Sequence, residues 1–132
     1  LLHMLRLTAG EIKRQRLGRV ALLATDGTVK TGIYAKLFDE YGVPHILPDA
    51  DEQRAVMDVI YNGVKAGRTD YDTANLRAAL DALIKRGAEA FVLGCTELPV
   101  AFEDYHLDYP AVDPTLVLAL AAVEAAGYDA IP

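Results

Sequence analysis

Short apolar runs alternate along the chain with segments whose apolar residues recur every three or four positions. Four of these runs predict strands, at residues 20–24, 45–47, 90–93 and 111–112. The runs are apolar throughout, which is typical of parallel strands that helices cover on both faces. The pattern therefore predicts an α/β fold, a three-layer sandwich around a four-stranded parallel sheet.

The segments between the runs predict amphipathic helices, and the first seven residues read like the middle of another helix. Each predicted helix is bounded by a capping residue, a helix-starting proline or a glycine stop. The predicted segments are 29–41 with a stop at Gly42, a helix from Asp49 or Asp51 to Gly67, one from Asp70 or Asp72 to Gly87, and one from Pro114 to Gly127.

Polar side chains gather in the loops that follow the predicted strands, at residues 25–28, 48–51, 94–98 and 113–115. The carboxyl ends of parallel strands meet at one edge of a sheet, and open α/β sheets bind their ligands there. We therefore expect the functional site at this edge.

Cys95 is the only cysteine of the chain, and it follows the apolar run 90–93 after a single glycine. In such a turn a thiol can meet free backbone N–H groups, which favour its thiolate form. A lone cysteine can equally be a small buried hydrophobe. Because Cys95 comes after the apolar run and not within it, we take it, with the neighbouring Thr96, as the first candidate for chemistry.

Three further residues are candidates for binding. Thr25 and Thr28 bracket a strand-to-helix turn whose hydroxyl and N–H donors can hold an anion, although Thr28 could simply cap its helix. Lys65 lies near a helix end, where a cation is favourable with or without a function. The turn lacks the spacing of a phosphate-binding loop, and no histidine pair has metal-ligand spacing. The pattern thus indicates neither a nucleotide nor a metal site.

Composition narrows the class of protein. The 132 residues are 52% hydrophobic, which suffices for a single domain over residues 1–132. The net charge of −6 disfavours nucleic acid and anionic membrane surfaces as partners. The apolar run 116–123 is far shorter than the roughly 20 residues that cross a bilayer. With one cysteine and no secretory pattern, we expect a soluble cytoplasmic protein.

Four motifs, taken in order, resemble those of the cofactor-independent aspartate/glutamate racemase family. They are the strand-to-helix turn at 22–28, the helix residues 51–53, 60–61 and 64–67, the cysteine motif at 94–97, and the closing turn at 112–114. The resemblance extends over nearly the whole chain, and it is to the second, C-terminal half of the family's two-domain fold.

The resemblance implies a two-cysteine mechanism without pyridoxal phosphate, metal or nucleotide. One cysteine thiolate removes the α-proton of aspartate or glutamate, and a second thiol returns a proton to the opposite face. Carried over to this chain, Cys95 is one of these two groups. Thr25, Thr28 and Thr96 would hold the α-carboxylate, and Lys65 would favour the thiolate or meet the acidic side chain.

The family's first half, which carries the other cysteine, has no counterpart in these residues. The resemblance therefore implies a piece of a longer protein, inactive or nearly so alone, whose partner is the missing half or another copy of the chain. The closing helix, residues 114–127, is apolar around most of its surface. We expect this helix to be buried on more than one side and to pack on the missing half, so that the chain alone self-associates or is marginally stable.

Two other interpretations stay open. Hydantoin racemases, maleate isomerases and arylmalonate decarboxylases have similar folds, so the reaction could be one of theirs. The chain could also be a non-catalytic module that binds a small molecule. A Cys95 pKa well below that of a free thiol would favour catalysis, and an inert buried thiol would favour the module.

Overall fold

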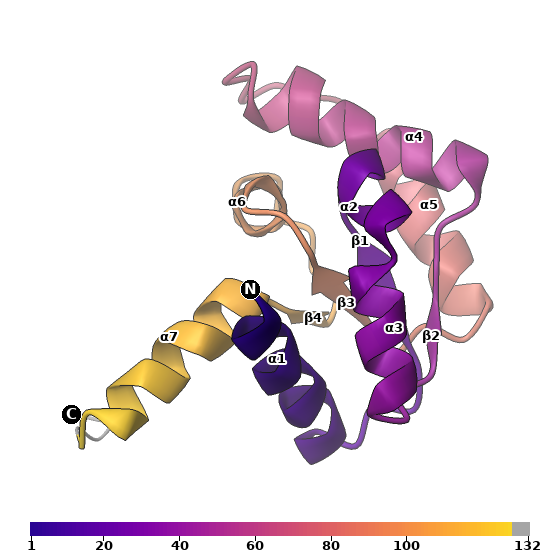
Figure 1. Ribbon diagram of the computed structural model, residues 1–132. Helices are drawn as coiled ribbons and strands as arrows, with labels where there is room; N and C mark the ends of the chain where they lie inside the picture. The colour runs from indigo at the N-terminus through magenta and orange to yellow at the C-terminus, as the bar shows by residue number, and fades with distance from the viewer. Residues whose placement is uncertain (128–132) are drawn as a thin grey trace.

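Four parallel strands form one sheet in the order β2-β1-β3-β4 in the computed structural model, which describes residues 1–127 (Figure 1). The strands are β1 (Val20–Leu23), β2 (His45–Ile46), β3 (Ala90–Leu93) and β4 (Ala111–Val112). The predicted strands 90–93 and 111–112 are confirmed at both ends, and the other two each end one residue earlier than predicted. The four-stranded parallel sheet is therefore confirmed.

Helices occupy most of the remaining chain. They are α1 (Leu2–Arg14), α2 (Asp26–Thr31), α3 (Ile33–Glu40), α4 (Ala50–Asp58), the π-helix η1 (Val59–Val64), α5 (Ala74–Lys85), α6 (Glu97–Asp104) and α7 (Pro114–Ala125). None of the helices within residues 1–127 has both the length and the apolar character that crossing a bilayer requires.

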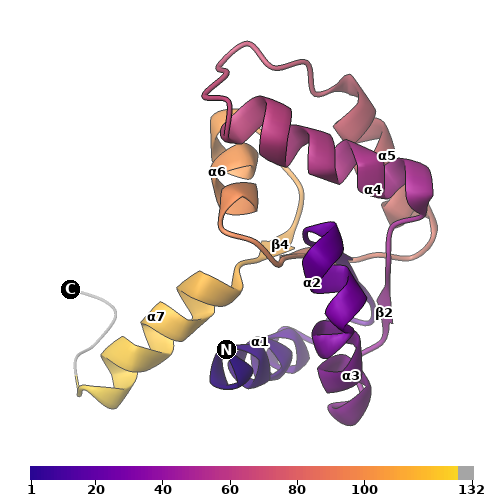
Figure 2. The ribbon, with the colours of Figure 1, turned by 45° about the horizontal axis from the view of Figure 1, so that its top comes forward.

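The two central strands send alternate side chains into two separate cores. Leu23 and Phe91 point into a core covered by α4, η1, α5 and α6. Leu22 and Val92 point into a second core, covered by α1 and α3. Figure 2 shows these two groups of helices on opposite sides of the strands. Strands buried on both faces have to be apolar at every position, and the predicted three-layer sandwich is confirmed.

Capping residues fix several of the predicted boundaries. Asp49 accepts the backbone N–H of Glu52, and the Glu52 carboxylate accepts that of Asp49, so the two form a capping box at the start of α4. Pro114 occupies the first turn of α7, as predicted. The third predicted helix begins later than expected, at Ala74, although Asp72 still accepts the N–H of Ala74 at 2.9 Å.

Three features differ from the predicted pattern. The predicted helix 29–41 is two helices, because Gly32 adopts a left-handed conformation with φ of 67° and ends α2. The second predicted helix changes into the π-helix η1 after Asp58. The short helix α6 is missing from the predicted pattern altogether, and it covers one core with Leu98, Ala101 and Phe102.

The closing helix α7 has an exposed apolar side. It packs against α1, as both views show (Figures 1 and 2), and Pro114 is its only fully buried residue. Leu116, Leu120 and Val123 are 55%, 45% and 38% exposed. One side of the helix is thus uncovered in this chain, because α1 covers only part of the apolar surface of α7, and the packing of that side on a missing half stays a prediction.

A buried carboxylate joins α4 to the end of α5. Glu52 is 6% exposed. Its two oxygens lie 2.7 Å from Nη1 of Arg86, and the Nη2 of Arg86 donates to the backbone oxygen of Leu47 at 3.1 Å. Glu52 thus caps its own helix and also holds α5 and the end of β2 in place.

Candidate functional site

Cys95 lies at the carboxyl edge of the sheet, where β1 and β3 run side by side. Leu23 and Leu93 are in register, and the N–H of Gly94 donates to the oxygen of Leu23 at 2.7 Å. A Cβ on Gly94 would lie 3.0 Å from that oxygen and 3.0 Å from the Cβ of Ala24. Glycine is therefore needed for the two chains to approach this closely, and the approach brings Cys95 next to the loop that starts at Thr25.

Thr25 and Thr28 meet in that loop. The hydroxyl of Thr25 donates to the hydroxyl of Thr28 at 3.2 Å, and it accepts the Thr28 backbone N–H at 3.3 Å. Thr25 is therefore the N-cap of α2, and the reading of Thr28 as the cap is wrong. Both side chains are half-buried, and together they place two hydroxyl groups at the start of a helix.

The sulfur of Cys95 is half-buried at the start of α6. Burial raises the pKa of the Cys95 thiol, and the carboxylate of Glu97 adds to this rise. The backbone N–H groups of Glu97 and Leu98 and the charge of Lys65 act in the opposite direction. The Leu98 N–H also donates to the backbone oxygen of Cys95 at 3.3 Å. The N–H groups of this turn thus favour the thiolate, but that of Leu98 is not free. The expectation of a lowered pKa is wrong, because burial outweighs those donors.

Glu97 connects two of the predicted binding residues. Its Oε2 accepts the Thr96 hydroxyl at 2.6 Å, and its Oε1 lies 3.7 Å from the Lys65 Nζ. Thr96 is the N-cap of α6 but makes no side-chain capping bond, since its hydroxyl turns to Glu97. Lys65, Thr96 and Cys95 are therefore brought together. Glu97 is not among the predicted site residues. Its position two residues after the cysteine is the sequence feature that could have indicated it.

The π-helix determines where Lys65 lies. Lys65 directly follows η1, whose extra residue per turn rotates the following side chains relative to an α-helix. Its Nζ lies 5.0 Å from the centre of the Tyr61 ring, a distance at which a cation is attracted to the ring face. Gly63 allows η1 to pack closely, since a Cβ there would lie 3.1 Å from the Tyr105 hydroxyl and 3.2 Å from the Tyr71 ring.

Tyr34 is a further group near Cys95 that the sequence pattern does not single out. It lies in the first turn of α3 and is 3% exposed. Burial raises the pKa of Tyr34 to about 12, and the charges of Cys95 and Asp113 contribute to the rise. Tyr34 of α3, Cys95 after β3 and Asp113 after β4 are therefore close enough for their charges to interact.

Replacing Tyr34 with phenylalanine is expected to remove a loss of stability at high pH. A pKa raised from near 10 to about 12 means that the neutral phenol is favoured in the folded state. This contribution is complete below pH 10 and is lost as the pH rises towards 12, and it amounts to about 3 kcal/mol. Urea unfolding between pH 9 and 12 should show a weaker pH dependence for Tyr34→Phe than for the wild type. Equal pH dependence in the two proteins would contradict the prediction.

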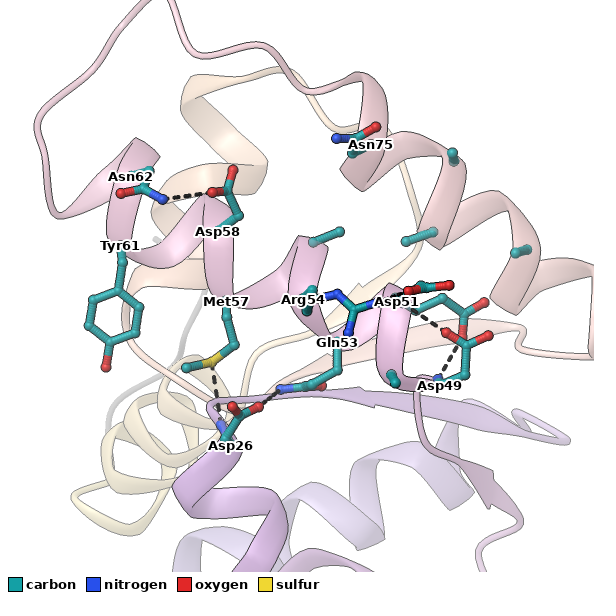
Figure 3. Close-up of a pocket in the computed structure, with 16 residues that line it drawn as sticks. Asp26, Asp49, Asp51, Gln53, Arg54, Met57, Asp58, Tyr61, Asn62 and Asn75 are labelled. Atoms are coloured by element: carbon teal, nitrogen blue, oxygen red, sulfur yellow. Dashed lines mark hydrogen bonds and ion pairs between the residues drawn. The ribbon is translucent and has the colours of Figure 1, made fainter.

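A groove of about 1060 Å³ lies between α4 and α5 (Figure 3), and Cys95 is not among the residues that line it. Short side chains of alanine leave space between these helices, and Asp26, Asp49, Asp51 and Asp58 line the groove. Carboxylates of this number disfavour an acidic ligand. Within residues 1–127 no group of three or more His, Cys, Asp or Glu side chains is arranged to hold a metal ion. We therefore place the candidate site at Cys95 and not in this groove.

Known proteins share this chain's sequence in part. An uncharacterised protein of Pectobacterium carotovorum is 35% identical over 103 residues, which are 78% of this chain and 68% of that protein. Glutamate racemase of Geobacter metallireducens is 31% identical over 87 residues, which are 64% of this chain but only 30% of the enzyme.

Solved structures match nearly the whole chain. Aspartate racemase of Picrophilus torridus is 32% identical with a TM-score of 0.71, and the match covers 96% of this chain and 52% of that one. A proposed Asp/Glu racemase from Yersinia pestis is 30% identical with a TM-score of 0.80, over 96% of this chain and 56% of that one. The chain thus spans about half the length of these structures. The family model for Asp/Glu/hydantoin racemases matches residues 1–131, and the chain therefore belongs to this family.

Proposed function

We propose that this chain supplies one cysteine-bearing half of the active site of a cofactor-independent aspartate or glutamate racemase. The observation that carries the proposal is the position of Cys95. Its sulfur lies at the carboxyl edge of a parallel sheet, beside the first turn of α6, where the backbone N–H groups of Glu97 and Leu98 favour the thiolate. Those N–H groups offset part of the cost of burying a charged sulfur.

In the proposed reaction the Cys95 thiolate removes the proton from Cα of the bound amino acid. The electron pair of the C–H bond stays on the substrate, where it delocalises into the α-carboxylate, and the proton moves to sulfur. Hydroxyl groups of Thr25, Thr28 and Thr96 donate to that carboxylate, which gains charge in this step. Burial raises the thiol pKa in the chain, and the ammonium group of a bound amino acid favours the thiolate by its charge.

Inversion at Cα needs a second thiol that returns a proton to the opposite face. This chain contains one cysteine. We therefore propose that another cysteine-bearing half, from a longer polypeptide or a second copy, faces Cys95. The exposed apolar residues Leu116, Leu120 and Val123 of α7 support a further half that packs there.

The test of this function is an activity assay on two proteins. The coding region upstream should contain a second cysteine motif, and the longer polypeptide should interconvert the enantiomers of aspartate or glutamate in a chiral chromatography assay. Cys95→Ser should abolish this activity, and the 132-residue chain as a monomer should be inactive or nearly so. Racemisation that persists in Cys95→Ser would refute the role of the cysteine. Ordinary enzyme rates from the short chain as a monomer would refute the need for a second half.

One observation favours a second candidate, a non-catalytic module that binds a small molecule. The pKa of Cys95 is raised, as expected for a buried thiol without a catalytic role. The presence of Lys65 3.7 Å from Glu97 still favours a site for carboxylates over one for neutral ligands such as hydantoins. An inactive longer polypeptide that binds aspartate would support the module.

A further inference from the structure

The carboxylate of Glu97 already contacts two of the groups proposed to hold the substrate. It accepts the Thr96 hydroxyl at 2.6 Å and pairs with the Lys65 ammonium at 3.7 Å. A hydroxyl donor beside a cation is also the arrangement that an external carboxylate needs for binding. An incoming carboxylate would therefore find the Thr96 hydroxyl and the Lys65 ammonium already in contact with Glu97.

The two partners differ in how freely they can move. Glu97 lies in the first turn of α6, which is anchored by the fully buried Leu98, and its side chain is 25% exposed. Lys65 is 47% exposed and has a long flexible side chain. Lys65 can therefore turn from Glu97 to a ligand, while the glutamate carboxylate stays near the start of α6.

Several charged or titratable groups act on the sulfur from the surrounding elements. They are Glu97 of α6, Lys65 after η1, and Tyr34 of α3, which also faces Asp113 before α7. Within residues 1–127, Lys65 is the cation in this set, and its attraction is shared between Glu97 and Cys95. Any group that removes Lys65 from Glu97 changes the reactivity of the thiol.

We propose that Glu97 is a positioning residue that competes with carboxylate ligands for Lys65 and Thr96, and thereby sets both ligand affinity and the reactivity of Cys95. The inference rests on the proposed function for the identity of the site, but it concerns carboxylate binding and thiol chemistry and not turnover. Removing the charge of Glu97 leaves Lys65 free to attract an external carboxylate and the thiolate together.

The single cysteine allows a direct test on the 132-residue chain. Iodoacetamide and iodoacetate alkylate a thiolate in the same way, but only iodoacetate carries a carboxylate. The rate with iodoacetate divided by the rate with iodoacetamide therefore measures how strongly the surroundings of the Cys95 sulfur attract a carboxylate. Glu97→Gln should raise this ratio about threefold or more and raise the iodoacetamide rate at pH 7. Lys65→Gln, at an exposed position that does not endanger folding, should lower the ratio.

Two controls separate competition from simple charge repulsion. Glu103→Gln removes the same charge from an exposed position of α6, and it should leave both rates unchanged. In the double variant Lys65→Gln/Glu97→Gln, the effect of Glu97→Gln should shrink to that of its own charge on the sulfur, because the cation for which it competes is absent. An equal effect of Glu97→Gln with and without Lys65 would overturn the proposal, as would an unchanged ratio in Lys65→Gln.

The outcome is separate from that of the racemase test. If the effect of Glu97→Gln on the alkylation rates depends on Lys65 but the longer polypeptide is inactive, Glu97 remains a competitor in a carboxylate-binding site. The racemase proposal is then rejected. If the longer polypeptide is an active racemase but the effect of Glu97→Gln does not depend on Lys65, only the proposed role of Glu97 is rejected.

Discussion

Replacing Arg86 with methionine is expected to destabilise the chain by about 2–4 kcal/mol, because it leaves a buried carboxylate without its cation. Both oxygens of Glu52 lie 2.7 Å from Nη1 of Arg86, and Glu52 is 6% exposed. The Arg86 side chain is 40% exposed, so water can partly replace it, and the cost falls at the lower end of what fully buried pairs show. The free energy of unfolding in urea measures the effect.

Two further variants make this prediction specific. Arg54→Met removes a surface cation that pairs with Asp51 within α4, and both partners are exposed, so the change should cost less than about 1 kcal/mol. Adding Glu52→Gln to Arg86→Met should recover part of the loss, since the amide oxygen can still accept the N–H of Asp49. Wild-type stability in Arg86→Met would show that the pair does not hold α4 to α5.

Replacing Gly94 with alanine is expected to destabilise the chain by about 1–3 kcal/mol through overpacking. The new Cβ would lie 3.0 Å from the backbone oxygen of Leu23 and 3.1 Å from Cδ1 of Leu22. A strand backbone cannot move aside as a flexible side chain can, so β3 must shift at its carboxyl end. Because Cys95 is the next residue in the chain, the shift should also change its alkylation rate.

Gly10→Ala is the matched control for this substitution. Gly10 lies within α1, it is exposed, and a Cβ there would meet nothing within 4 Å. Alanine should therefore stabilise the helix by about 0.5–1 kcal/mol. Opposite signs for the two glycines, measured as unfolding midpoints in urea, would support the close approach of β1 and β3. Destabilisation of equal size in both variants would contradict it.

Most of the fold could be predicted from local signals. The strand residues 90–93 and the start of α4 at Asp49 follow from an apolar run and a capping pattern, which need no knowledge of distant residues. The apolar pattern does not single out helix α6, although Leu98, Phe102 and the C-cap residue Tyr105 recur at helical spacing. Its eight residues include Pro99, and so short a segment is easily taken for a loop.

The candidate site was predictable only in outline. Cys95, Thr25 and Thr28 follow neighbouring strands, so their convergence follows from the parallel topology. The meeting of Lys65 with Glu97 depends on the π-helix η1, which shifts the position of Lys65 around its helix by an amount that no residue pattern states. Tyr34 reaches the region because Gly32 interrupts the helix just before it.

The sequence by itself determined the parallel sheet, the edge at which polar loops gather and the placement of Cys95 after β3, because periodicity, caps and chain direction are properties of neighbouring residues. Only the tertiary structure decided the charge state that the thiol favours and the partners of Lys65 and Glu52. Burial and charge pairing depend on which distant segments come together. The desolvation they produce outweighs the backbone donors that the local motif supplies to the sulfur.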